Sequence, residues 1–349
     1  MNKNIAVIFG GTSSEHEISL HSAKAVLNNL PSGYNAVPVW ISKEGEWFYF
    51  SGDMDVFHDT FFKGTSADEL SDYFVKTVIS PDRKSQCLIS DKLKIHIDTA
   101  FPVMHGMGGE DGTLQGLLEL AGIPICGCGV LPSAVCMDKY RAHKLVSTAG
   151  IAVPEAITYT DLAKIKPNQV EREIGLPVYV KPLRGGSSCG ISRVSDIGEL
   201  IKAAQKAFKF DNEIIIEREI KGTEVGCTII GTNELIIGEV DQIILADSFF
   251  DYTEKYTPKS SRILCPAPVS AELSNRIKET AKTVYRTLGC RGFARVDMFL
   301  SEDGEIVFNE VNTIPGFTEH SRFPSMMKAA GYSFAQVIEM IIDKAAERI

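Results

Sequence analysis

Short apolar runs alternate with segments of helical spacing over the first 120 residues. Continuous apolar runs at Ile5–Phe9 and Val37–Ile41 predict buried strands, and Asp98–Val103 predicts another. Apolar positions recur at helical intervals over residues 19–30, and residues 112–121 predict a second helix. Alternation of strands and helices indicates an α/β domain.

The pattern changes after about residue 123. One long helix is predicted over residues 133–149, and later helices at 271–288 and 334–347. Val178–Pro182 and Ile191–Val194 are predicted to form a hairpin, and Ile214–Glu217 another strand. Strands of antiparallel character are then predicted at Val225–Ile230, Leu235–Val240, Phe293–Leu300 and Glu305–Asn309. Residues 249–262 are polar, aromatic and poorly periodic, and so long a loop in a compact domain is typically a lid or binding loop.

The composition is that of an ordinary globular protein. The 349 residues are 44% hydrophobic and 23% charged, so two or three domains are expected. The formal net charge of −9 argues against a nucleic-acid partner, which would require a basic face. No apolar stretch approaches the roughly 18 residues of a membrane span, and the N-terminus does not resemble a signal peptide. The eight cysteines form no CxxC pair, so reduced thiols and a cytoplasmic location are expected.

Two acids and an amide in the last third of the chain suggest a metal site. Asp297, Glu310 and Asn312 offer hard oxygen ligands, which suit Mg²⁺ or Mn²⁺ better than zinc. Side chains alternate along a strand, so Glu310 and Asn312 share a face that Asp297 can join from a neighbouring strand. Arg295 shares the face of Asp297 and can pair with it or stabilise transferred charge. The alternative is a pair of edge-strand acids in solvent.

Several loops are candidate ligand sites. The hairpin tip at 184–190 is rich in glycine and serine and follows Lys181, so its N–H and hydroxyl groups and the lysine can approach a phosphate. It is neither a P-loop nor a dinucleotide fingerprint, and a simple turn is the alternative. The acidic segment at 216–224 can read an adenine edge and a ribose, or be a solvated charge cluster. The loops at 11–17 and 105–112 follow strands where α/β sheets bind ligands; a surface cap is the alternative for their histidines.

Motifs spread along the whole chain resemble the D-alanine–D-alanine ligase family, of the ATP-grasp fold. They are FGGTSSEHEISL, HGMGGEDGTLQG, MDKYRAHKL, VKPLRGGSSCG, DYTEKY, GFARVD and NEVNTIPGFTEHS. The resemblance implies a mixed α/β and α+β architecture: an N-terminal α/β (pre-ATP-grasp) domain at 1–122, a central subdomain at 123–217 and a C-terminal subdomain at 218–349. ATP is then clamped between the last two. A homodimer acting on small molecules, without nucleic-acid or membrane partners, is expected.

The family couples two D-amino acids at the expense of ATP. The carboxylate of the first D-alanine attacks the γ-phosphate, and the amine of the second substrate then attacks the resulting acyl phosphate. By motif match, ATP would be held by Lys139, Lys181, Ser188, Glu217, Glu219, Ile220, Glu224 and Lys255. Two Mg²⁺ or Mn²⁺ ions would be held by Asp297, Glu310 and Asn312.

The same match assigns the residues around the first substrate. Glu15 would bind the ammonium of the first D-alanine, with His105 beside it. Arg295 would steady the transferring phosphoryl group, and Gly316 would supply an N–H group to the oxyanion. Glu15, Ser187 and Tyr256 would form a hydrogen-bonded set that closes the 249–262 loop, since an acyl phosphate needs water kept out.

Departures from the family pattern concern the second substrate. Tyr256 matches the dipeptide-forming members, which disfavours D-lactate. Arg322, after Ser321, stands where D-alanine ligases carry Leu; with Asp241 and Phe250 it resembles the D-alanine–D-serine ligases of vancomycin resistance. A guanidinium can reach a hydroxyl group and Leu cannot, so D-serine is expected and a housekeeping D-alanine–D-alanine ligase is the alternative. Other ATP-grasp ligases and non-catalytic ATP-binding subunits are more distant alternatives, because they would lack the three-residue set that closes the loop.

Overall fold

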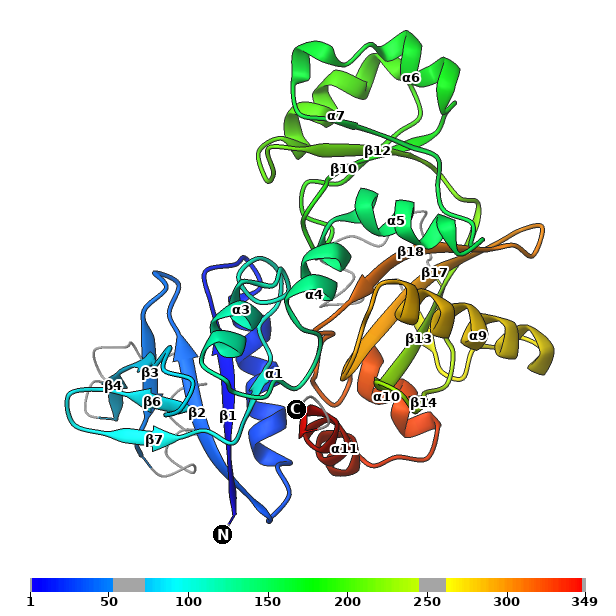
Figure 1. Cartoon of the computed structure of the whole chain (residues 1–349). Coiled ribbons are helices and arrows are strands. Elements are labelled where there is room, and N and C mark those ends of the chain that lie inside the picture. The colour runs from blue at the N-terminus through cyan, green and yellow to red at the C-terminus, as the bar shows by residue number, and fades with distance from the viewer. Residues whose placement is uncertain (1, 53–72, 245–261, 347–349) are drawn as a thin grey trace.

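The computed structural model describes residues 2–52, 73–244 and 262–346, and the strands in these ranges form four sheets (Figure 1). The N-terminal sheet has the strand order β4-β3-β2-β1-β8. Strand β1 lies between β2 and β8 and pairs in parallel with both, which explains why its apolar run is continuous rather than alternating. The elements are β1 (Lys3–Gly10), α1 (His16–Asn28), β2 (Tyr34–Ile41), β3 (Trp47–Phe50), β4 (Phe74–Lys76) and β8 (Thr99–Pro102).

A small antiparallel sheet and three helices lead to the centre of the chain. They are β5 (Val78–Ile79), β6 (Cys87–Ile89), β7 (Lys94–His96), α3 (Thr113–Leu120), α4 (Val130–Met137) and α5 (Lys139–Thr148). The prediction of one helix over 133–149 was wrong, because the backbone at Asp138 is extended and separates α4 from α5. The Asp138 carboxylate caps α5 by accepting the Arg141 N–H at 2.9 Å. The break places Lys139 at the first position of α5.

The central part is an antiparallel sheet in the order β11-β10-β12-β9, seen at the top of Figure 1. Its elements are β9 (Ala156–Tyr159), β10 (Val178–Pro182), β11 (Ser192–Val194), β12 (Ile214–Arg218), α6 (Pro167–Glu173) and α7 (Leu200–Ala207), with short 3₁₀ turns at Leu162–Lys164 and Ile197–Glu199. The helices α6 and α7 pack their apolar residues with those of the sheet in one core. Strands β10 and β11 form the predicted hairpin.

The largest sheet has the order β16-β15-β13-β17-β18, with β14 paired to β13. Its part of the chain comprises β13 (Gly222–Gly231), β14 (Leu235–Ile237), β15 (Asp241–Ile244), β16 (Arg262–Leu264), α9 (Ala271–Thr287), β17 (Phe293–Ser301), β18 (Ile306–Asn312), α10 (Arg322–Ala329) and α11 (Phe334–Ala346). Of the strand predicted over 235–240, only Leu235–Ile237 is a strand, β14. Strand β15, which begins at Asp241, and helix α10 were not predicted.

The packing of the two ends of the chain bears on the site. Residues of β1, α1, α10 and α11 share one hydrophobic core, so the first and last parts of the chain are packed together. All eight cysteines are free thiols. Within the described ranges, no helix has both the length and the apolarity needed to cross a membrane.

Candidate active site

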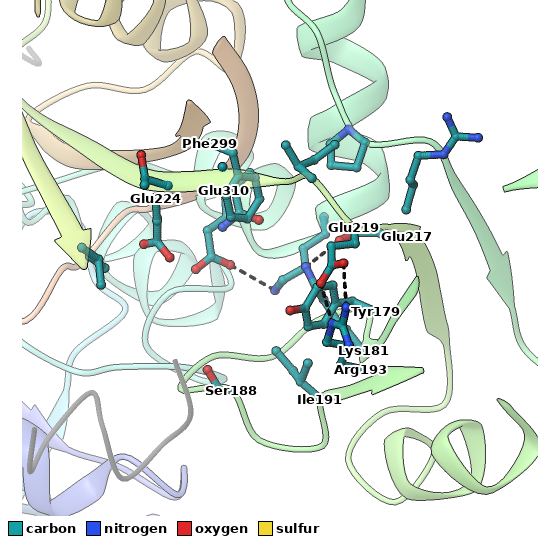
Figure 2. A pocket seen from close by; sticks show the side chains of 18 of the residues that line it. Tyr179, Lys181, Ser188, Ile191, Arg193, Glu217, Glu219, Glu224, Phe299 and Glu310 are labelled. Carbon is teal, nitrogen blue, oxygen red and sulfur yellow. Dashed lines mark hydrogen bonds and ion pairs between the residues drawn. The ribbon is translucent and has the colours of Figure 1, made fainter. Parts of the chain in front are cut away.

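A cavity of about 580 Å³ is lined by residues of the four-stranded and six-stranded sheets. Figure 2 shows Glu224 and Glu310 directed into it from the large sheet, with Ser188 on the other side. Seven of the predicted ATP-binding residues line the cavity: Lys139, Lys181, Ser188, Glu217, Glu219, Ile220 and Glu224. The eighth, Lys255, lies outside the described residues. The walls therefore combine cations, carboxylates and a glycine-serine loop in one space.

The first acid of the 216–224 segment, Glu217, is buried and does not belong to a solvated charge cluster. Glu217 on β12 is only 2% exposed, and its Oε2 atom lies 2.5 Å from the Nζ atom of Lys181. Burial alone would raise the pKa of Glu217, but Lys181 and the neighbouring cations lower it below the ordinary value, so the carboxylate is ionised. Farther along, Glu219 pairs with Arg193 at 2.6 Å. The Lys139 ammonium donates to the Gly185 carbonyl at 2.7 Å and lies 3.5 Å from Glu310.

The hairpin tip approaches the N-terminal sheet. Ser187 and Ser188 have φ angles of 52° and 57°, a conformation that costs free energy for residues other than glycine. In this conformation the Ser187 hydroxyl donates to the Glu15 carboxylate. A Cβ atom at Gly186 would lie 3.0 Å from that carboxylate, and one at Gly106 only 2.8 Å from it. The structure therefore brings Glu15 and Ser187 together, while Tyr256 and the 249–261 segment lie outside the described residues.

The three candidate metal ligands lie on β17 and β18. Asp297 is opposite Glu310 in the strand register, and its Oδ2 atom accepts a hydrogen bond from the Asn312 amide at 2.8 Å. Arg295 donates to both oxygens of Asp297, at 2.8 and 2.7 Å. Asp297 is 1% exposed, so the alternative of solvent-exposed edge acids does not hold for it.

This donor set fits a hard cation. Among the described residues, no three or more His, Cys, Asp or Glu side chains are grouped so that they could hold a metal ion by themselves. Two carboxylates and an amide leave coordination positions for phosphate oxygens and waters, which is how Mg²⁺ is commonly bound. The positive charges of Arg295 and Lys139 meet these carboxylates in the structure, at Asp297 and Glu310.

Arg322, the first residue of α10, is held by Asp241. Its Nε and Nη2 atoms donate to the two Asp241 oxygens at 2.7 and 2.8 Å. Its Nη1 atom donates to Glu224 at 2.8 Å and lies 3.3 Å from Asp297. Burial opposes the charge on Arg322, but Asp241 and the other two acids raise its pKa well above the ordinary value. Phe250 lies outside the described residues.

His105 connects the N-terminal sheet to the turn after β18. Its Nδ1 atom donates to the Ile314 carbonyl at 2.9 Å, and Nε2 lies 3.2 Å from the Ser22 hydroxyl. Burial lowers the pKa of His105, which favours the neutral ring. In the same turn, a Cβ atom at Gly316 would lie 3.1 Å from the Ser321 Oγ atom. The turn thus brings Gly316 beside Ser321, the residue before α10.

Glu110 is a half-buried acid to which the sequence analysis gave no role, although it belongs to the same HGMGGEDG motif as His105. One oxygen accepts the Gly106 N–H at 2.9 Å and the other accepts the Ile314 N–H at 3.1 Å. Burial, reinforced by the nearby charge of Glu15, raises the pKa of Glu110 to about 8. Glu110 therefore ties the loop after β8 to the turn after β18.

We expect Glu110→Gln to destabilise the protein by roughly 1–3 kcal/mol, and more at about pH 5 than at about pH 9. The folded pKa of about 8 lies above the ordinary value of 4.5. The stability that Glu110 contributes is therefore fully present below the unfolded pKa and is lost as the pH rises through the folded one. Thermal unfolding of both proteins across this range measures the difference. A difference that does not change with pH would contradict the expectation.

Comparisons with known proteins agree with this geometry. Two family models match the chain: D-ala D-ala ligase N-terminus over residues 4–128, and D-ala D-ala ligase C-terminus over residues 145–343. The chain is 40% identical to a D-alanine–D-alanine ligase of Caldicellulosiruptor bescii over 99% of this chain and 95% of that protein. It is 43% identical to the vancomycin B-type resistance protein VanB of Enterococcus faecalis over the full length of both. The crystal structure of the VanG D-Ala:D-Ser ligase from Enterococcus faecalis is 48% identical, with a TM-score of 0.90 over 99% of this chain and 100% of that one.

Proposed function

Because the chain belongs to the D-alanine–D-alanine ligase family, we propose that it joins D-alanine to D-serine in an ATP-dependent reaction through a D-alanyl phosphate. Membership of the family makes it an ATP-dependent ligase of the ATP-grasp fold. The preference for D-serine is the specific part of the proposal. The dipeptide then serves as a building block for peptidoglycan precursors in the cytoplasm, and the enzyme acts as a homodimer.

The observation that carries the D-serine proposal is the buried Arg322–Asp241 pair. Two parallel hydrogen bonds fix the guanidinium plane, so donors of known direction stand at a position where Leu would offer none. A site built around polar groups discriminates strongly against a substrate that leaves them unpaired, whereas an apolar site discriminates weakly against an added hydroxyl group. The 48% identity to the VanG D-Ala:D-Ser ligase supports the same choice.

The remaining residues position the substrates and balance their charge. Lys139 and Lys181 bind the ATP phosphates with the N–H groups of the 184–190 loop, and Glu224 receives the ribose. Mg²⁺ held by Asp297, Glu310 and Asn312 neutralises phosphate charge when it is bound. Phosphoryl transfer depends mainly on such positioning and electrostatic stabilisation.

The first D-alanine lies at the junction of the N-terminal sheet and the hairpin tip. Glu15, fixed by the Ser187 hydroxyl, binds its ammonium group beside His105. Arg295 stabilises the negative charge of the transferring phosphoryl group, and the Gly316 N–H donates a hydrogen bond to the oxyanion. Neutral His105 holds the turn before Gly316 through the Ile314 carbonyl.

Product identification tests the proposal. The enzyme is incubated with ATP, Mg²⁺ and equal concentrations of D-alanine and D-serine, and the dipeptides are separated and quantified. We expect D-alanyl-D-serine to predominate. Predominant D-alanyl-D-alanine would make the chain a housekeeping ligase, which its 40% identity to a D-alanine–D-alanine ligase keeps as the second candidate. If phosphate release from ATP does not depend on D-amino acids, the ligase assignment itself is overturned.

A further inference from the structure

A row of acidic residues crosses the large sheet and is interrupted by one glycine. In the strand register, Gly226 on β13 is the partner of Asp241 on β15 and also of Asp297 on β17. Asp297 is in turn the partner of Glu310 on β18. Glu224 lies two residues before Gly226 and therefore on the same face of β13. The glycine leaves a space among these four carboxylates.

The Arg322 guanidinium fills this space. A Cβ atom at Gly226 would overlap the Nη2 atom of Arg322 and lie 2.7 Å from the Asp241 Oδ1 atom. The Gly226 backbone is not in the left-handed region, so what the position requires of its residue is a missing side chain and not a special conformation. A cavity kept open in the sheet by glycine and occupied by a buried cation is a built feature of this site.

The Arg322 guanidinium contacts acids that have different proposed roles. Asp241, at 0% exposed, takes two of the hydrogen bonds of Arg322, and the proposed function assigns this pair to the second substrate. The Nη1 atom faces the other way: it donates to Glu224, which lines the nucleotide cavity, and lies 3.3 Å from Asp297. The guanidinium therefore separates two carboxylates that would otherwise repel each other across the glycine.

We propose that Arg322 is also a positioning residue for nucleotide binding, which holds Glu224 toward the ribose and screens Asp297 from the neighbouring acids. This inference rests on the proposed function, since that function assigns Glu224 to the ribose and Asp297 to the metal. Under it, the second-substrate pocket and the nucleotide cavity share one guanidinium.

Removal of this cation has two opposite consequences. Nucleotide binding without metal weakens, because Glu224 loses the hydrogen bond from Arg322 that orients it. Binding of the divalent cation becomes tighter, because one fewer positive charge competes for Asp297. General damage to the sheet would weaken both.

The test measures binding without amino acids and without turnover. Calorimetry gives the Kd of ADP in EDTA, and electron paramagnetic resonance gives the Kd of Mn²⁺ for the enzyme–ADP complex. The principal variant is Arg322→Leu combined with Asp241→Asn, which removes both charges of the buried pair. Gly226→Ala keeps Arg322 but displaces the end of its flexible side chain. Lys328→Leu removes one positive charge from an exposed position on the same helix and is the matched control.

We expect the ADP affinity to fall about tenfold in the double variant and in Gly226→Ala, and to stay unchanged in Lys328→Leu. Mn²⁺ should bind the double variant more tightly than wild type. An ADP affinity within about twofold of wild type in both folded variants overturns the inference, as does a parallel weakening of ADP and Mn²⁺. Product identification is independent of this result: a D-alanyl-D-alanine product with the expected ADP loss refutes only the D-serine proposal, and the reverse pattern refutes only the inference.

Discussion

Replacement of Glu310 by Gln is expected to lower kcat about a hundredfold or more while leaving the fold intact. The substitution keeps the size and shape of the side chain. It removes one negative charge from β18, at the position opposite Asp297 on β17. That charge matters for holding a divalent cation against the ATP phosphates, where neutralisation of charge is the main catalytic requirement. Folding should be insensitive, because Glu310 is partly exposed and its ion pair with Lys139 is long, at 3.5 Å.

Steady-state kinetics over a range of Mg²⁺ concentrations measure the loss of kcat. Thermal unfolding measures whether the fold is intact. Glu305→Gln is the matched control, since it makes the same chemical change at an exposed position just before β18. We expect Glu305→Gln to retain wild-type turnover and both variants to unfold close to the wild-type temperature. Near-normal turnover in Glu310→Gln would remove Glu310 from the metal site.

Elements with strong local signals could be predicted from the sequence. The continuous apolar run of β1 and the periodic helix α9 appear close to the predicted positions. The helical stretch at 133–149 was misjudged, because a single cap at Asp138 outweighs periodicity that continues across it. The strand predicted over 235–240 was misjudged as well, because short segments such as β14 and β15 are fixed by pairing with β13 and not by their own composition.

The proximity of the candidate residues was predictable where motifs mark them and not where it depends on contacts between distant segments, and their roles stay predictions. Asp297, Glu310 and Asn312 follow from strand alternation, and the Asp241–Arg322 pair from the family pattern. The second contact of Arg322, to Glu224, depends on how α10 packs over β13. The role of Gly226 arises only from tertiary packing, since the residue has no distinctive local signal. Glu110 lies in the HGMGGEDG motif, but its contact with the Ile314 N–H depends on the packing of two distant segments.

Replacement of Arg322 by Leu is expected to shift the preference between D-serine and D-alanine toward D-alanine by about ten- to a hundredfold. Asp241 and Glu224 use three of the five N–H groups of Arg322. D-serine can accept from a remaining N–H group, and D-alanine leaves that group without this partner. Leu removes the unpaired polar groups, so the penalty against D-alanine disappears while D-serine loses a partner. The affinity for the first D-alanine should be roughly unchanged, because Glu15 and His105 belong to other elements of the fold.

The measurement is kcat/KM for each second substrate at saturating ATP, and the ratio of the two values is compared between proteins. The ratio is informative because any change in nucleotide binding affects both substrates alike. Since Leu leaves Asp241 buried without its cation, which can cost about 3–5 kcal/mol of stability, the Arg322→Leu, Asp241→Asn double variant is measured in parallel. The shift should appear in both variants and be absent from Lys328→Leu. If wild type already prefers D-alanine, or if the ratio is the same in wild type and in the folded variants, Arg322 does not choose the second substrate.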